Sequence, residues 1–314
     1  MNLFWKKIFG ILTPTAKYEK QEVDFLIASE KNKTLRYSSA VAEYKKLYLS
    51  SKFTSAQTRK LNQSRLTALK KHPDVISFLK NYSKRNSPNR DAFLTFSDDF
   101  YWKKPEDSLW NAGFYFKNEK LIRNYSFHNE KQANNAGNNT SVHAGVLQIQ
   151  TRREVLKSLA WHPDHGFTEK QFAYTSDILQ SAKNFRQQEG IFKAKIKCSG
   201  NIHHAFWLGT EAKEPHINIF HFDGKEIQMG YVNQQNGDGV IIKGINPAEY
   251  FIYSLEWTKD ELVWYINNLP VLRANHNIPR ESMFLVFNSF IPEYITGEEG
   301  LLEVDWVRVY QYNA

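Results

Sequence analysis

Three polar side chains that could do chemistry occur close together in the segment "EPHINIFHF", residues 214–222. Apolar and polar residues alternate in it with the period of two that is typical of a strand. His216 and Asn218 therefore point to the same side, and His221 joins them if the strand carries one extra residue, as in a β-bulge. Two imidazoles and an amide on one face could exchange protons, ligate a metal ion or hydrogen-bond the hydroxyl groups of a sugar.

A metal site would need ligands from a second strand. His203 and His204 precede this segment by about a dozen residues, and three imidazoles can ligate zinc, so these two could join His216 and His221. Against this interpretation, the adjacent histidines lack a ligand-spacing motif, and no carboxylate is placed to orient an imidazole. We therefore expect neither a metal ion nor another cofactor.

The hydrophobic pattern changes to a period of two after residue 91. Many short strands between turn signals favour a mainly β protein, a sandwich or a barrel. The segments 153–172 and 233–248 lack the alternation and are expected to be loops. The predicted strands are residues 145–152, 190–198, 205–209, 214–222, 250–257, 262–268, 283–290 and 301–312.

Residues 1–90 are predicted to form a small helical region. Apolar residues from Tyr37 to Tyr48 recur at the spacing of one stripe along a helix. The polar segment 83–91 contains a proline and marks the best domain boundary. The sequence therefore predicts two domains, a helical one over residues 1–90 and a β domain over residues 91–314.

Charge is unevenly distributed between the two predicted domains. Residues 1–90 carry 19 Lys and Arg against 6 Asp and Glu, a net charge of +13, whereas the remainder carries 22 against 27, a net charge of −5. Such asymmetry indicates a basic region that meets an anionic surface, or else a solvated face of lysine-rich helices. Nucleic acid is not the expected partner, because the interleaved aromatic and basic residues of a known binding module are missing.

The beginning of the sequence bears on localisation. Its apolar run after Lys6 and Lys7 is shorter than a secretory signal requires, and no run reaches the ~20 apolar residues of a membrane span. The expected localisation is cytoplasmic, and the alternatives are secretion and a short anchor in the membrane interface. The residues that would form such an anchor are Leu3, Phe4, Ile8, Ile11 and Leu12.

Six motifs occur in an order that identifies a known family. "FSDDF" and "NEKQANNAGNNTSVHAGVLQIQTRRE" come first, followed by "YTSDILQS" with "FRQQEGIFKAKIK" and by "HHAFWLG". "YFIYSLEWTKDELVWYINNLPV" is similar to the family's "FHTYAIEWTPDEIRWYVDGVLV", and "LEVDWVRVYQY" to its closing "VDYVRVYQ". Residues 94–314 resemble glycoside hydrolase family 16, the laminarinase-like enzymes. The resemblance implies a concanavalin A-like β-jelly-roll sandwich.

The family's catalytic signature, "EIDIFEF", falls on the segment described first. In the family the first Glu is the nucleophile, the Asp orients it, and the second Glu is the acid/base. Carried over to this sequence, the three positions are occupied by His216, Asn218 and His221. None of the three carboxylates that the resemblance implies is present.

Loss of these carboxylates removes the chemistry of a retaining glycosidase, which needs two carboxyl groups about 5–5.5 Å apart. An imidazole can act as an acid, but it is a poor nucleophile toward the anomeric carbon. Glu214 and Asp223 lie on either side of the row, but nine residues of strand span roughly 30 Å. Retaining hydrolysis by the family mechanism is therefore not expected.

The expected function is binding of a polysaccharide, such as a β-glucan or a galactan, without hydrolysis. The alternatives are an interaction or scaffold protein that docks through its basic helices, and a glycosidase or metal-dependent enzyme with altered catalytic chemistry. Sugar sites combine aromatic platforms with hydrogen-bonding side chains. The candidate carbohydrate-binding residues are Trp207, His216, Asn218, His221, His203, Asn129 and Tyr231.

Overall fold

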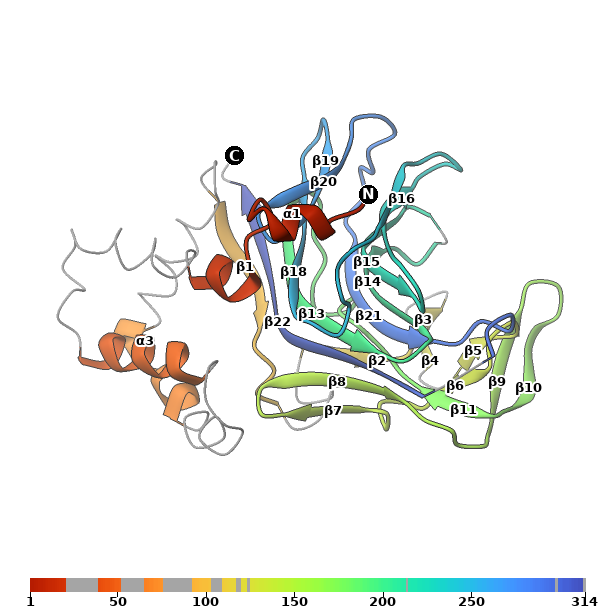
Figure 1. Cartoon of the computed structure of the whole chain (residues 1–314). Coiled ribbons are helices and arrows are strands. Elements are labelled where there is room, and N and C mark those ends of the chain that lie inside the picture. The colour runs from red at the N-terminus through yellow and green to blue at the C-terminus, as the bar shows by residue number, and fades with distance from the viewer. Residues whose placement is uncertain are drawn as a thin grey trace.

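The computed structural model describes residues 1–20, 39–51, 65–75, 92–102, 109–116, 120–122, 125–212, 214–296 and 299–312. Two antiparallel sheets pack face to face and form a β-sandwich (Figure 1). The first sheet contains, in spatial order, β20 (Leu269–Ala274), β19 (Leu262–Ile266), β18 (Phe251–Trp257), β13 (Gly190–Ser199), β22 (Gly300–Tyr312), β8 (Val146–Thr151) and β7 (Thr140–His143), with β1 (Ala92–Asp98) also paired to β22.

The second sheet has seven strands and carries the row of polar residues. Its spatial order is β17 (Gly239–Ile242), β16 (Ile227–Val232), β15 (His216–Asp223), β14 (His203–Gly209), β21 (Phe284–Phe290), β12 (Ile178–Gln180) and β2 (Asn111–Ala112). Smaller sheets pair β10 (Gly166–Phe172) and β5 (Tyr125–Phe127) with β9 (Leu156–His162), β11 (Tyr174–Ser176) with β6 (Gln132–Asn134), and β3 (Phe114–Phe116) with β4 (Lys120–Ile122). The described helices with full bounds are α1 (Phe4–Ile8) and α3 (Ser39–Ser51).

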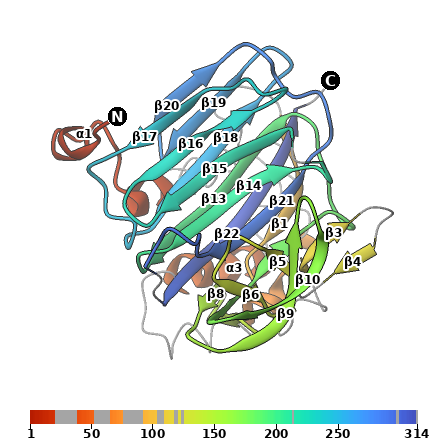
Figure 2. The same cartoon turned by 90° about the vertical axis from the view of Figure 1, so that its right-hand side faces the viewer.

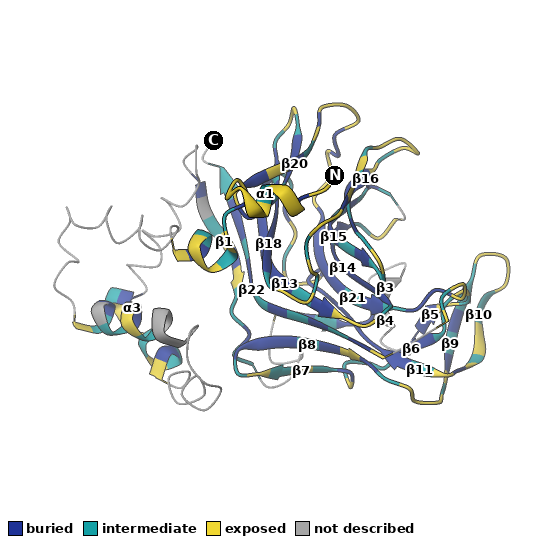
Figure 3. Ribbon diagram, in the orientation of Figure 1, coloured by how far each residue is buried: buried dark blue, intermediate teal, exposed yellow. Residues whose placement is uncertain are grey.

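The core lies between the two large sheets, whose strands are largely made of buried residues (Figure 3). Alternating side chains from both inner faces meet there. Phe206, Phe220 and Phe287 of the seven-stranded sheet are fully buried, as are Trp257 and Trp264 of the other sheet. Each large apolar side chain buried in this way contributes about 1.5–3 kcal/mol to folding. The three phenylalanine side chains occupy the inner face of the seven-stranded sheet. A binding site on this sheet would therefore lie on its outer face.

The mainly β prediction and the sandwich are confirmed, and each predicted strand matches an observed one within three residues at either end. Two predicted loops are wrong. Residues 153–172 contain the hairpin β9–β10, and residues 233–248 contain β17. Strand β10 alternates only weakly because much of it is exposed, and β17 is a four-residue strand at a sheet edge. Neither has the one-sided burial that produces a readable pattern.

The predicted helix near residue 40 is confirmed as α3. Its Val41 and Tyr44 are buried together with Leu66 and Val75 in a small cluster separate from the core of the sandwich. Tyr37 and the predicted boundary at 83–91 lie outside the described residues, so the division at residue 90 stays a prediction.

The first 20 residues lie against the sandwich. Leu3 and Leu12 are fully buried and belong to its core cluster. Glu19 is also buried, and its carboxylate accepts hydrogen bonds from Lys195 Nζ of β13 at 2.8 Å and from Trp306 Nε1 of β22 at 3.0 Å. Leu3, Leu12 and Glu19 are therefore packed with the β-sandwich.

Candidate functional site

Strand β15 carries the predicted bulge. Opposite β14, Phe220 pairs with Phe206 and Asn218 pairs with Trp207, so the intervening Ile219 is an extra residue without a partner. The same shift appears against β16. A bulge leaves backbone groups outside the ladder, and Trp264 Nε1 donates to the Asn218 carbonyl oxygen at 2.9 Å. A fully buried indole of the opposite sheet thus holds the bulge.

The bulge places the polar row on the outer face of the seven-stranded sheet. His216, Asn218 and His221 are half-buried, whereas Ile217 and Ile219 between them are fully buried in the core. Figure 2 looks onto this face, with β16, β15, β14 and β21 side by side. The three positions that the resemblance assigns to catalysis therefore share one solvent-facing side, as predicted.

One half of the row is built around Trp207 of β14. The His216 imidazole stacks on the indole with ring centroids 4.5 Å apart, and its Nε2 donates to Asn218 Oδ1 at 2.9 Å. Trp207 Nε1 donates to Asn288 Oδ1 of β21 at 2.9 Å. A Cβ at Gly209 would lie 2.4 Å from the indole, so this glycine gives the ring its place over the strand. The stack on His216 occupies part of the aromatic platform that we predicted for a sugar.

The other half is a pair of imidazoles. His203 Nδ1 and His221 Nε2 are 2.9 Å apart and share one hydrogen bond. Tyr294 OH lies 3.4 Å from His203 Nε2, and the Phe290 ring packs against both imidazoles. The loop after β21 therefore supports the His203–His221 pair. Tyr294 and Asn288 were missed at the sequence level, because neither stands in a motif that indicates chemistry.

Two of the candidate residues, His204 and Tyr231, do not lie on the outer face of the seven-stranded sheet. His204 is fully buried on the core side of β14, where Nδ1 contacts Ser289 Oγ at 2.8 Å and Nε2 contacts the Ser199 carbonyl oxygen at 3.0 Å. Tyr231 is buried in the core cluster, and its hydroxyl donates to the His276 carbonyl oxygen. Strand alternation turns both side chains away from the outer face.

Asn129 is exposed and belongs to the loop region beside Tyr294. Its carbonyl oxygen accepts a hydrogen bond from Glu293 N at 3.0 Å. Its neighbour Glu130 is a further titratable group that sequence reasoning missed, although the "NEKQ" motif contains it. Burial raises the pKa of Glu130 to about 7, against hydrogen bonds from Phe127 N and Gln132 Nε2 that lower it. A carboxyl group that is partly protonated at neutral pH therefore lies in this segment.

The candidate histidines do not come together as a zinc site. His204 points to the core, His216 is bonded to Asn218, and only His203 and His221 touch each other. Within the residues that the structure describes, no group of three or more His, Cys, Asp or Glu side chains could hold a metal ion.

Burial keeps the imidazoles of the site neutral. It lowers the pKa of His221 to about 4, with help from nearby His203, and it lowers the pKa values of His203 and His216 as well. The pKa of the fully buried His204 falls to about 3 for the same reason. At neutral pH these side chains are uncharged, so each ring offers one donor and one acceptor.

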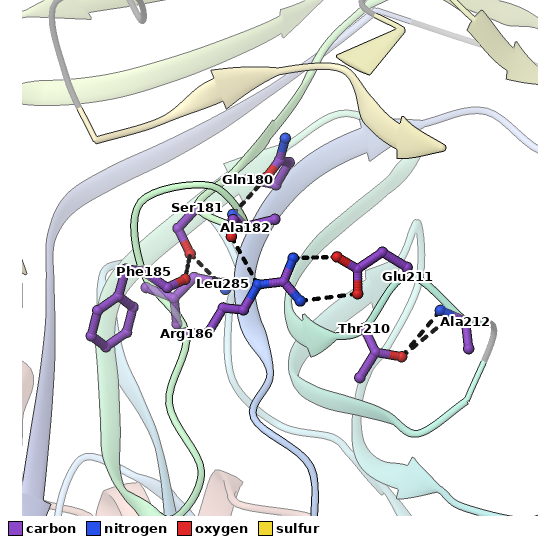
Figure 4. Close-up of polar contacts among 9 residues, drawn as sticks. All are labelled: Gln180, Ser181, Ala182, Phe185, Arg186, Thr210, Glu211, Ala212 and Leu285. Atoms are coloured by element: carbon purple, nitrogen blue, oxygen red, sulfur yellow. Dashed lines mark hydrogen bonds and ion pairs between the residues drawn. The ribbon is translucent and has the colours of Figure 1, made fainter. Parts of the chain in front are cut away.

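An ion pair links two loops at one end of the seven-stranded sheet. Arg186, in the loop after β12, contacts both carboxylate oxygens of Glu211, in the loop after β14 (Figure 4). Arg186 Nε also donates to the Ala182 carbonyl oxygen at 2.8 Å, and Ala182 N donates to Gln180 Oε1 at 2.7 Å. Such a bidentate pair fixes both partners in one geometry. It holds two loops next to the end of β14 that carries Trp207.

We expect the unfolding free energy to decrease in acid because of these histidines. A histidine in the unfolded chain takes up its proton near pH 6.5, whereas folded His204 does so near pH 3. The unfolded chain therefore binds more protons in this window, and the stabilisation present above pH 6.5 is lost as the pH falls toward 3. Uptake of this one proton by the unfolded chain lowers the unfolding free energy by about 1 kcal/mol per pH unit.

The measurement is chemical denaturation at several pH values between these limits. His204→Gln should flatten the slope of stability against pH, and the exposed His143→Gln should leave it unchanged. Equal slopes in the native chain and His204→Gln would contradict the assignment.

Comparison with known proteins relates the chain to β-glucan hydrolases. No family model matches it. It is 25% identical over 175 residues to a β-glucanase of Brevibacillus brevis, which covers 48% of this chain and 68% of that protein. It is 23% identical over 251 residues to an endo-1,3-1,4-β-glycanase of Rhizobium meliloti, covering 70% of this chain and 52% of that protein. The chain thus spans about half the length of the Rhizobium protein.

Solved structures confirm the jelly-roll fold. The catalytic domain of a laminarinase from Thermotoga petrophila is 20% identical, with a TM-score of 0.57 and coverage of 72% of this chain and 100% of that one. The laminarinase from Rhodothermus marinus is 18% identical, with a TM-score of 0.58 and the same coverage. A non-specific endo-β-1,3(4)-glucanase of family 16 is 23% identical, with a TM-score of 0.57, and covers 71% of this chain and 92% of that one. Laminarinases and β-glucanases are therefore among the relatives and structural neighbours of the chain.

Proposed function

We propose that this relative of family 16 β-glucanases binds a polysaccharide, such as a β-glucan or a galactan, on the outer face of its seven-stranded sheet and does not hydrolyse it by the family mechanism. One observation carries the proposal. The bulged strand β15 presents His216, Asn218 and His221 on a single solvent-facing side, beside Trp207, where the resemblance implies three carboxylates.

The carboxylates at the two ends of β15 have other roles. Glu214 Oε2 accepts a hydrogen bond from Gln235 N at 2.8 Å. Asp223 accepts hydrogen bonds from Lys225 N, Glu226 N and Gln228 Nε2 at 2.7–2.9 Å, which hold its pKa low despite partial burial. Glu214 and Asp223 are nine residues apart along an extended chain, roughly 30 Å, so the pair cannot provide two carboxyl groups at retaining distance.

The same face offers what a sugar needs. Trp207 supplies an aromatic edge and a partly covered face, while Asn218, Asn288 and the neutral imidazole of His221 supply hydrogen-bonding groups. Neutral groups bind sugar hydroxyls without the cost of burying a charge. Protonation of His221 below about pH 5 would introduce that cost, so we expect affinity to fall there.

A second candidate function, altered catalysis, is favoured by the hydrogen bond between His203 and His221. A base held by a second group is the arrangement that general base catalysis uses. Acid catalysis by His221 is disfavoured, because a pKa of about 4 leaves little of the protonated form at pH 7. The hydrolysis assay described in the Discussion decides between binding and altered catalysis.

We expect Trp207→Ala to weaken polysaccharide binding about tenfold or more, since an aromatic contact and the support of His216 are both lost. The measurement is isothermal titration calorimetry of the full chain with laminarin, lichenan and a galactan. Trp5→Ala, an exposed tryptophan on α1, is the matched control and should bind like the native chain. Absence of binding to every glycan would instead favour the interaction or scaffold protein.

A further inference from the structure

Large apolar side chains gather at one edge of the sandwich. Among the described residues, twelve large apolar side chains are exposed, and seven of them lie in residues 1–11 or on the adjoining Ile241. Each of the seven is 43% to 71% exposed. We call this surface the α1 patch. It consists of Met1, Phe4, Trp5, Ile8, Phe9, Ile11 and Ile241. Exposed apolar side chains that are scattered singly over a surface are normal. A contiguous group of large ones marks an interaction site.

The backbone that carries the patch is fixed to the sheet edge. Leu3 N donates to the Lys243 carbonyl oxygen and Lys243 N donates to the Met1 carbonyl oxygen, both at 2.6 Å, so residues 1–3 extend the sheet next to β17. Gly244 lies so close to Phe4 N that an added Cβ would approach it to 2.5 Å. The α1 patch is therefore held in place and does not depend on folding against a partner.

The far end of the segment is anchored as well. Asn268 donates to the Ile11 carbonyl oxygen and accepts from Thr13 N, at 3.2 and 2.9 Å. Leu3 and Leu12 are the buried side chains, and they point into the sandwich. Burial of these two turns the intervening apolar side chains outward, which is the reverse of the usual orientation of a surface helix.

Charge and side-chain chemistry indicate the occupant. Residues 1–20 contain four lysines and one acidic residue, Glu19, which is buried with Lys195. Lys6 lies within α1 beside Trp5, and the rings of Trp5 and Phe9 stack at 6.0 Å. Aromatic and aliphatic side chains flanked by lysines bind the interface of an anionic bilayer, where the rings enter the headgroup region and the lysines meet its charge.

We propose that the α1 patch binds the surface of an anionic lipid bilayer. In Figure 2, α1 projects beyond β17 at the side of the seven-stranded sheet, whose outer face is turned to the viewer. The side chain of Ile241 faces the same side of the sheet as His221, because both residues pair with Gln228. A bilayer at the α1 patch would therefore meet the margin of the proposed glycan face. This inference does not depend on the proposed glycan binding.

The test is co-sedimentation of the full chain with vesicles of phosphatidylcholine alone and of phosphatidylcholine and phosphatidylglycerol in equal parts. We expect binding to the anionic vesicles. Trp5→Glu with Phe9→Glu should reduce the partition coefficient by more than about tenfold. The double variant loses two apolar side chains and gains two negative charges that an anionic surface repels. Lys6→Ala should reduce it about fivefold.

Matched controls keep the test sharp. Leu109→Glu with Val155→Glu makes the same change at two exposed apolar positions elsewhere, and Lys259→Ala removes an exposed lysine elsewhere. Both should bind like the native chain. No binding to anionic vesicles, or equal loss in the controls, overturns the proposal. It is also overturned by a concentration-dependent dimer, without vesicle binding, that Trp5→Glu with Phe9→Glu abolishes, since the patch then contacts a second copy.

Discussion

The purified chain is expected to release no reducing sugar from laminarin, lichenan, agarose or carrageenan, because no carboxylate occupies the row of His216, Asn218 and His221. Retaining hydrolysis requires a carboxylate nucleophile and a carboxyl acid on opposite sides of the glycosidic bond. A reducing-sugar assay over prolonged incubation measures the outcome. Turnover above background that disappears in His221→Ala would contradict the proposal and establish altered catalysis.

Restoring the carboxylates is the sharper experiment. The triple change His216→Glu, Asn218→Asp and His221→Glu should raise hydrolysis of a bound glucan by about 10² or more, the contribution expected of positioned acid–base groups. The variant His216→Gln, Asn218→Asp and His221→Gln keeps similar shapes without the two glutamates and should stay inactive. Equal activity of the two variants would show that the residues on β15 do not control hydrolysis.

The second large effect concerns stability. Leu3→Ala and Leu12→Ala should each lower the unfolding free energy by about 2–5 kcal/mol, because both side chains are fully buried in the core of the sandwich. Their neighbours Phe4 and Ile11 are exposed, and the corresponding alanine variants should stay within about 0.5 kcal/mol of the native chain.

Denaturation midpoints of the four variants test this pattern. Small effects at all four positions would mean that residues 1–20 do not pack against the sandwich in solution. The α1 patch would then lose its fixed support, so this measurement also bears on the membrane proposal.

The row on β15 was predictable because strand alternation is a local property. Two-residue spacing placed His216 and Asn218 on one side, and a single extra residue was enough to add His221. The partners of the row were not predictable in the same way. Asn288 and Tyr294 are brought to it by β21 and the following loop, more than 60 residues away in sequence, and no local pattern encodes that pairing.

The difference between His203 and His204 shows the same limit. Both were candidates, since a period of two does not say which of two adjacent residues faces the core. The pairing of β14 with β15 and β21 decides that His203 meets His221 and that His204 is buried against Ser289. Tyr231 was also a candidate, and its pairing with the core residue Ile217 of β15 turns its side chain to the inner face.

The sequence by itself indicated a mainly β protein, the segments that form its main strands, and the shared side of His216 and Asn218. These follow from periodicity and motifs, which are written along the chain. Only the tertiary structure decided that Leu3 and Leu12 enter the core while Phe4, Trp5 and Phe9 face outward. The sequence pattern alone does not say which of these neighbouring apolar residues are buried. The backbone contact of residues 1–3 next to the distant edge strand β17 decides it.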